Sequence, residues 1–571
     1  MSQSNFSRRY FFYGSLLAGA VPRGGFGSVP SLAALGYKSP NEKLNLAAIG
    51  AGGQPGSDLR SAVAGVENVV ALTDVDWERG AGGFRTYPNA AKYKDFRQML
   101  DKSGRDIDAV VIGTADHMHA TCALACMQLG KHVYVEKPLT RTAWEARLLT
   151  QAAAKYPKVA TQMGNQGYSH DATRIACEIF WSGEIGEVRE VHAWHGSPGW
   201  PQGMQKIPAP TPVPESLDWD LWLGGAAARP YTAGDEEYRE FAASPMSRGR
   251  GAPAAAAAAG APAGRGAPAA QAGRGGMGGG QQFGFYLPFN WRGFYDFGSG
   301  LFGDWGVHIL GPANWALQLS PESLISIETI KREGTSPFTY PVQNAIKYEF
   351  GPRGNLPPVT VYWSDCIQGD AYLPPEMTAE DARKIQNTGP QVGPVRGQGG
   401  FFPGTGAAPA AGRAGEPGRA PITAGEQAGR GRGGGGGAAR PVSSGYNCIF
   451  VGSKGYMGTS GRGEGVGLLP GAKWAEYRLP NAYLPRSPGA SFGDNGSAHL
   501  RDWVRACKGG SPACSNFSIG GPYTEWLVLG AVATHFEGKL LWDNAKCEIS
   551  NNRDANKWVK PTFRKGWEIK L

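Results

Sequence analysis

Residues 44–59, "LNLAAIGAGGQPGSDL", are the most informative part of the sequence for the fold class. Its apolar start predicts a strand, its glycines predict a tight turn, and "SDLRSAVAG" predicts a helix directly afterwards. Gly50 permits the turn, and Gly52 and Gly53 let the backbone approach a phosphate group that the N-terminus of the helix attracts. The third glycine of this fingerprint is replaced by Pro55, which suits a first helical turn, and Gly56 follows it.

Short apolar runs alternate with helical patterns from this stretch to residue 165. "ENVVALTDVD" (67–76), "DIDAVVIGTA" (106–115) and "KHVYVEK" (131–137) predict strands, whereas "KYKDFRQMLDKSG" (92–104) and "HATCALACMQLG" (119–130) predict helices. Buried strands that alternate with helices form a parallel sheet covered on both faces. We therefore predict the α/β class, with an N-terminal Rossmann domain at residues 41–165.

The second strand of this pattern ends with an acidic residue. Asp74 follows Gly50 at the spacing at which an acid binds the adenosine ribose, and Asp76 is a second candidate. Such a carboxylate would repel the 2′-phosphate of NADP. The sequence therefore favours NAD as the cofactor, with NADP as the alternative.

The pattern changes after residue 165, and a C-terminal α+β domain is expected at residues 166–571. "NAIKYEF" (344–350) and "VTVYW" (359–363) alternate apolar and polar residues with a period of two, which predicts antiparallel strands in a large open sheet. Residues 245–282 and 389–442 are Gly/Ala/Pro/Arg-rich, so we predict two disordered insertions there.

The formal net charge of +9 is concentrated in three segments. Residues 1–40, 245–282 and 389–442 each carry +4, which leaves about −3 for the remainder. The folded part is near neutral, and no nucleic-acid partner is indicated. No zinc-type cysteine spacing occurs, and of the 8 cysteines only Cys507 and Cys514 form a close pair that either bridges or stays free.

The N-terminus has the pattern of an export leader. Residues 7–12, "SRRYFF", resemble a twin-arginine signal, and "AGA" at 18–20 has the form of a cleavage site. An ordinary basic N-terminus or a general secretory signal is the alternative. We expect residues 1–40 to be a leader and linker, and the mature protein to be periplasmic or otherwise extracytoplasmic, without a membrane anchor.

Three further motifs carry a family resemblance. "EKP" (136–138) lies at the end of the strand at 131–137, "GTADHMHA" (113–120) begins at the end of the strand at 106–115, and Asp304-x-Gly306-x-His308 lies in the second domain. With the glycine turn, these motifs resemble the Gfo/Idh/MocA oxidoreductases, which include glucose-fructose oxidoreductase and inositol dehydrogenase. The resemblance covers nearly the whole chain apart from the leader and the two insertions. An aspartate that family members often carry three residues after the motif histidine is Gly311 here.

The resemblance implies roles for these residues. Lys137 would lie beside the nicotinamide with Glu136 at the cofactor, and Thr114 and His119 would lie nearby. Asp304 and His308 would act on the substrate.

The chemistry of alcohol oxidation agrees with these roles. A hydride leaves to NAD, and a base must take the proton. Histidine suits this task near neutral pH, and Lys137 can stabilise the developing alkoxide charge. Asp304 and His308 would share one helical turn facing the cleft. The structural alternative is a core histidine at 308 beside a capping Asp304. Pro138 is expected to aim Lys137 inward through a cis peptide bond.

Other residues are weaker candidates for contacts to the substrate. Asn165 follows a strand end, and Arg292 and Tyr295 have side chains that can bind hydroxyl groups. Four tryptophans are either faces for a sugar ring or packing residues. They are Trp200, Trp219, Trp222 and Trp291.

The sequence predicts an exported NAD(P)-dependent oxidoreductase that acts on a sugar, polyol or related compound with a tightly bound cofactor and no metal. The first alternative is an NAD-dependent glycosidase or lyase that works by transient oxidation and elimination. The second is a carbohydrate-binding protein without catalysis. Family resemblance also implies a homo-oligomer, either a dimer or a tetramer.

Overall fold

The computed structural model describes most of the two predicted domains. The described residues are 42–196, 198–244, 284–365, 372, 374–375, 446–470, 477–486 and 495–571. The predicted leader at 1–40 and the predicted insertions at 245–282 and 389–442 lie outside them.

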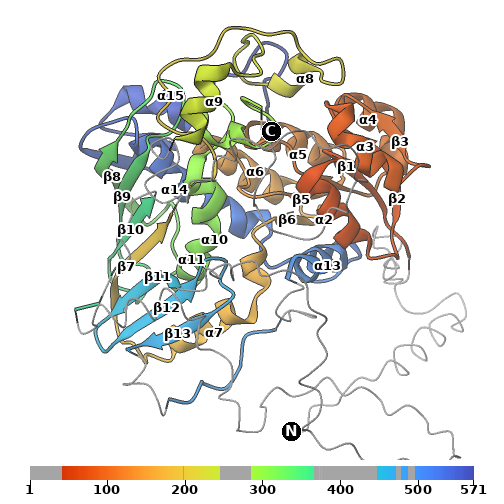
Figure 1. The fold of residues 1–571 in the computed structure, drawn as a ribbon. Helices are drawn as coiled ribbons and strands as arrows, with labels where there is room; N and C mark the ends of the chain where they lie inside the picture. Colours follow the sequence, from red (N-terminus) through yellow and green to blue (C-terminus); the bar gives the residue numbers. More distant parts are fainter. Residues whose placement is uncertain are drawn as a thin grey trace, which may run out of the picture.

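The first domain is a parallel six-stranded sheet with the order β3-β2-β1-β4-β5-β6 (Figure 1). Its strands are β1 (Asn45–Ile49), β2 (Asn68–Thr73), β3 (Ala91–Tyr93), β4 (Ala109–Ile112), β5 (His132–Val135) and β6 (Thr161–Met163). Its helices are α2 (Gly53–Val63), α3 (Trp77–Thr86), α4 (Phe96–Ser103), α5 (Asp116–Gln128) and α6 (Ala143–Lys155). The predicted α/β class and the N-terminal parallel Rossmann sheet are confirmed.

One predicted helix in this domain was too long at its start. Residues 92–93 belong to β3, which pairs in parallel with β2, and α4 begins only at Phe96. The Asp95 carboxylate accepts the N–H of Arg97 at 2.8 Å and caps the helix. The helix therefore starts directly after its capping residue, Asp95. Residues 92–93 are extended because they pair with β2.

The second domain is built on a nine-stranded sheet with the order β13-β12-β11-β7-β10-β9-β8-β14-β15. Its strands are β7 (Val188–His195), β8 (Leu324–Glu333), β9 (Gln343–Phe350), β10 (Val359–Asp365), β11 (Tyr446–Gly452), β12 (Tyr456–Ser460), β13 (Val466–Leu469), β14 (Lys539–Asp543) and β15 (Glu548–Ile549). Ile346 lies opposite Trp363 and Tyr348 opposite Val361, all of them buried, as the period-two pattern predicts. Only β7 and β10 pair in parallel among these described strands.

The helices of this domain flank the sheet and also reach the first domain (Figure 1). They are α7 (Asp171–Trp181), α8 (Trp219–Leu223), α9 (Glu236–Ala243), α10 (Val307–Ile309), α11 (Gly311–Ala316), α13 (Asn495–Cys507), α14 (Phe517–Ala533) and α15 (Asn556–Val559). α13 places Leu500 and Trp503 in the hydrophobic core of the Rossmann sheet. The Lys508 ammonium and the Glu67 carboxylate, 2.5 Å apart, form a nearly buried ion pair next to it. The C-terminal part of the chain therefore completes the nucleotide-binding domain.

The described cysteines are free thiols. Cys122 and Cys126 are fully buried in α5 and pack as small apolar residues. Cys507 and Cys514 are both free thiols. None of the helices in the described ranges has the length and apolar character needed to cross a bilayer.

Candidate active site

The glycine turn between β1 and α2 has the backbone that a dinucleotide requires. Gly50 and Gly53 have φ angles of +94° and +59°, which favour glycine. A Cβ atom at Gly53 would lie 2.6 Å from Nη2 of Arg79. Gly52 caps α2 without a side-chain hydrogen bond, and the first turn of α2 has no acidic residue. The helix N-terminus is thus free to bind phosphate oxygens.

The departure at Pro55 is compensated within the structure. Pro55 is buried against Gly113 at the end of β4, where an added Cβ would lie 2.7 Å from Cβ of Pro55. Gly56 lies close to Ala51, since its Cβ would be 2.6 Å from the Ala51 carbonyl oxygen. The close helix–strand packing that the third fingerprint glycine allows is supplied here by Gly56 and Gly113 together.

Asp74 lies at the end of β2 and already makes several hydrogen bonds. Its Oδ2 accepts the N–H groups of Ala51 at 3.0 Å and Gly52 at 3.1 Å, and its Oδ1 accepts that of Asp76 at 3.0 Å. Burial raises the pKa of Asp74 against the opposing effect of these bonds. A carboxylate has about four acceptor positions, so one remains for a ribose hydroxyl. The donors and acceptors of the turn therefore fit a dinucleotide.

Arg79 is a further candidate that sequence reasoning missed. It lies in the first turn of α3, three residues after the cap Asp76, and its exposed side chain reaches over Gly53. An arginine after the acidic residue of the second strand can contact an adenosine phosphate. In the sequence, the only indication of this role was that Arg79 follows Asp74, the acid expected to bind the ribose.

Lys137, Asp304 and Arg292 meet at one point. The Lys137 Nζ donates to Oδ1 of Asp304 at 2.8 Å and to its backbone oxygen at 2.9 Å. Arg292 Nε donates to the same Oδ1 at 3.0 Å. Burial would raise the pKa of Asp304, but the Lys137 and Arg292 cations outweigh burial and hold this pKa well below its usual range. Asp304 is therefore a carboxylate at any physiological pH.

The two motifs meet because small residues allow it. The Lys137–Pro138 peptide is cis, as expected. Gly303, one residue before Asp304, faces Pro138, since an added Cβ would lie 2.7 Å from Cγ of Pro138. Residues Phe302–Gly306 form a π-helical turn instead of the expected α-helical one, and α10 continues from it. Asp304 lies in this wider turn and His308 in α10, which follows directly, so one continuous helical segment supplies both residues to the site.

His308 is buried, and its Nδ1 has no hydrogen-bond partner among the described residues. Burial, followed by the charges of Lys137 and Arg462, lowers the pKa of His308 well below its ordinary value. The imidazole is therefore neutral and can accept a proton. The unpartnered Nδ1 favours the catalytic interpretation over a satisfied core histidine, which would have partners for its ring nitrogens.

The loop residues at the cofactor side mainly position the backbone. The His119 ring nitrogens lie 2.8 Å from the Pro138 carbonyl and 3.1 Å from that of Thr114, so His119 joins the loop after β4 to the loop after β5. Glu136 is buried, and burial raises its pKa against the effect of Lys137. Burial and the charge of Glu136 also raise the pKa of Asp58, in α2, well above its usual range.

The structure places the predicted substrate residues differently. Asn165 is buried with both amide atoms unpartnered among the described residues, which suits a ligand contact. Tyr295 is not brought to the site, because its ring packs against His535, Tyr340 and Trp558. The four tryptophans, Trp200, Trp219, Trp222 and Trp291, are all buried.

Sequence reasoning missed four neighbours of this site. The Trp305 ring stacks on His195 with centroids 4.4 Å apart, and the Arg462 guanidinium lies 5.4 Å from the Trp305 ring. Asp116 at the start of α5 accepts the N–H and the hydroxyl of Ser299 at 3.1 and 2.8 Å. Burial raises the pKa of Asp116 to about 7. Two of these residues lie in motifs already visible in the sequence: Trp305 follows Asp304, and Asp116 lies within residues 113–120.

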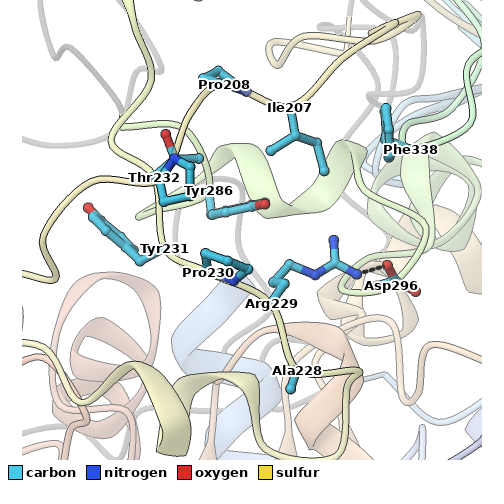
Figure 2. A pocket seen from close by; sticks show the side chains of 11 residues that line it. Ile207, Pro208, Ala228, Arg229, Pro230, Tyr231, Thr232, Tyr286, Asp296 and Phe338 are labelled. Atoms are coloured by element: carbon cyan, nitrogen blue, oxygen red, sulfur yellow. Dashed lines mark hydrogen bonds and ion pairs between the residues drawn. The ribbon is translucent and has the colours of Figure 1, made fainter.

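A separate cavity of about 340 Å³ lies near the segment that follows α8 (Figure 2). Figure 2 shows Tyr286 and the Arg229–Asp296 ion pair at its wall, together with Pro208 and Pro230. None of the predicted site residues lines it. Elsewhere in the described ranges, no three His, Cys, Asp or Glu side chains are grouped as a metal site would require.

Comparisons with known proteins agree with this geometry. Residues 44–164 match the sequence model of the Gfo/Idh/MocA family, described as an oxidoreductase family with an NAD-binding Rossmann fold. Inositol 2-dehydrogenase 2 of Saccharopolyspora erythraea is 28% identical over 163 residues, which are 28% of this chain and 48% of that protein. A glycosyl hydrolase family 109 protein of Solibacter usitatus is 28% identical over 194 residues, which are 32% of this chain and 42% of that protein.

The chain thus spans about half the length, or less, of these curated relatives. A solved structure of levoglucosan dehydrogenase with NADH and levoglucosan has a TM-score of 0.47 and 15% identity to this chain. That similarity covers 88% of this chain and 100% of the other. With its glycine turn, Asp74 and Glu136-Lys137-Pro138, the segment 44–164 is similar to the NAD-binding Rossmann domain of the Gfo/Idh/MocA oxidoreductase family.

Proposed function

We propose that the whole chain is an NAD-dependent oxidoreductase that interconverts a hydroxyl and a keto group on a sugar, polyol or related compound. The observation that supports this most directly is the contact of Lys137 with Asp304, with the neutral His308 on the same element. Lys137 leaves β5 at the carboxyl edge of the sheet, where ligands of open α/β sheets bind. The proposal thereby combines a cofactor turn, a cation and a base at one edge.

Each residue has a distinct task in the reaction. NAD, when bound, supplies a hydride acceptor. The His308 imidazole accepts the proton of the substrate hydroxyl, while the carbon–hydrogen bond breaks and the carbon–oxygen double bond forms. Lys137 donates a hydrogen bond to the oxygen that gains negative charge. Asp304 holds Lys137 and Arg292 in place, and neutralises part of their charge.

Two measurements test the proposal. Mass spectrometry of the supernatant of denatured purified protein should detect a nicotinamide dinucleotide, and its absence after loading with NAD would contradict the proposal. On any substrate found in a panel of sugars and polyols, Lys137→Ala should lose turnover at least about a hundredfold, the scale of positioned acid–base and electrostatic groups. Lys158→Ala, an exposed lysine in the same domain, is the matched control.

A second candidate is an NAD-dependent glycosidase or lyase, which the family 109 relative favours. Transient oxidation makes a neighbouring C–H acidic, a group is eliminated, and the cofactor returns to its starting state. The same Lys137 and His308 serve both reactions. Aryl glycosides distinguish them, because release of the aglycone without net NADH supports the second candidate and excludes simple oxidation.

Export through the twin-arginine route, with the cofactor bound before export, belongs to the same proposal. It is supported by residues 7–12 and by the lack of an exchangeable nicotinamide pool outside the cytoplasm. Cell fractionation tests it. The chain with both Arg8→Lys and Arg9→Lys should stay in the cytoplasm, and equal export of this variant would contradict the route.

Self-association of the chain is also proposed. Ile325 and Ile330 on β8 and Leu541 on the adjacent β14 are 53%, 52% and 39% exposed. Exposed apolar side chains on neighbouring strands favour contact with a second copy. Sedimentation velocity should show a dimer or tetramer, whereas a monomer at micromolar concentration would refute the proposal.

A further inference from the structure

Arg462 reaches the candidate active site from the far edge of the second sheet. It lies in the turn between β12 and β13, where Glu464 accepts the backbone N–H of Arg462 at 3.0 Å and the hydroxyl of Ser460 at 3.2 Å. Gly465 in turn donates its N–H to Ser460 at 2.9 Å. These bonds hold the turn, so the Arg462 side chain starts from a fixed backbone.

The Arg462 guanidinium lies beside the catalytic candidates. Its central carbon is 5.4 Å from the ring centroid of Trp305, the residue after Asp304. The Trp305 ring is 6.1 Å from the His308 ring and stacks on His195. A guanidinium over an indole face is oriented by a cation–π contact. Arg462 is therefore a cation placed at the Trp305 ring, and its charge contributes to the lowered pKa of His308.

The charges around this point do not balance. Lys137 and Arg292 share a single carboxylate oxygen of Asp304. Arg462 is exposed, and no carboxylate in the part of the chain that the structure describes forms an ion pair with its guanidinium.

The other titratable groups around the site do not offset this excess. Glu464 is engaged in its own turn, and burial raises the pKa of Asp116 to about 7 and that of Glu136 above its ordinary value, which reduces the negative charge that these two carboxyl groups carry. The imidazoles of His195 and His170 are neutral, because burial lowers the pKa of each to about 4. The site thus presents a cation without a counter-charge to its ligand.

We propose that Arg462 binds an anionic substituent, a carboxylate, on the sugar substrate whose hydroxyl is held by Lys137 and His308. The substrate class is then a uronic acid or uronide, and this inference rests on the proposed function. A guanidinium offers two parallel N–H groups that match the two oxygens of a carboxylate. A neutral sugar would leave Arg462 without such a partner.

Equilibrium binding to the NAD-loaded full chain tests this. The probes are the methyl glycosides of glucuronic, galacturonic and mannuronic acid, each compared with its neutral parent and with the parent's 6-sulfate. At least one uronide should bind tenfold or more tightly than its parent, because hydrogen bonds between charged groups are the strong ones. Arg462→Gln should remove that preference and leave the neutral parent within about twofold, while Arg462→Lys should keep part of it.

Arg189→Gln, at an arginine that is 62% exposed, is the matched control and should bind like the unmodified chain. Equal binding of uronides and neutral parents by the unmodified chain would overturn the inference, as would a preference that persists in Arg462→Gln. Tighter binding of the sulfates than of the uronides would overturn the assignment of a carboxylate. A protein that retains no dinucleotide after loading would contradict the proposed function, and this outcome is measured independently of the preference for uronides.

Discussion

The contact between Lys137 and Asp304 gives the sharpest test of the site's electrostatics. The two side chains are 16% and 10% exposed, and Arg292 shares the same carboxylate oxygen at 3.0 Å. Lys137→Met removes one cation but leaves Arg292 to satisfy the carboxylate. Because a hydrogen bond to a charged group contributes about 1.5–3 kcal/mol, we expect a loss of about 2 kcal/mol in the free energy of unfolding.

Asp304→Asn leaves two cations against one neutral oxygen. Removing one partner of a buried ion pair costs about 3–5 kcal/mol, and the partial exposure of both cations places the expected loss near 3. Both single variants lose the same contact. The double variant should therefore cost about 3 kcal/mol, which corresponds to a coupling energy of about 2 kcal/mol.

Urea unfolding of the cofactor-free protein measures this cycle. Tryptophan fluorescence and circular dichroism should report coincident transitions, so that one free energy is being compared. Lys158→Met, at an exposed lysine in the same domain, controls for loss of a charge and should leave stability almost unchanged. A coupling energy below about 0.5 kcal/mol is within ordinary additivity and would refute the view that the two residues form an energetic unit.

The other predictions concern the base and the cofactor turn. His308→Asn should lower turnover about 10²–10⁴-fold in steady-state assays, as expected for a positioned base. Because the pKa of His308 is lowered, activity should persist as the pH falls below about 6.5 and be lost only near that lower pKa. Arg462→Gln removes a charge that lowers this pKa, so the acid limb of the kcat/KM profile should move to higher pH. Gly113→Ala should cost about 1–3 kcal/mol in urea unfolding through contact with Pro55, and Pro55→Ala should relieve only part of it, because alanine keeps the Cβ that would lie 2.7 Å from the new methyl group. Arg79→Ala should weaken cofactor binding in calorimetry by about tenfold, with unchanged affinity counting against a phosphate contact.

Several site residues could be predicted because their chemistry is encoded locally. Gly50 and Gly53 need positive φ angles in a tight turn, and Lys137 follows a strand end, so short motifs were sufficient to identify them. Asp304 and His308 share one motif four residues apart, which brings them together in an α- or a π-turn alike. Tyr295 was the opposite case. Its ring packs against His535 and Trp558, which lie far from it in the sequence, so the residues around Tyr295 could not indicate this contact.

The parallel sheet and its cofactor turn could be predicted from the sequence, because strand and helix periods and turn glycines act over a few residues, whereas the candidate pair Asp304 and His308 was identified through a family resemblance. Only the tertiary structure decided that α13 completes the Rossmann core and that Arg462 stands beside Trp305. Those contacts join segments far apart in the chain. They depend on how two sheets pack, and no local pattern of charge or hydrophobicity records that arrangement.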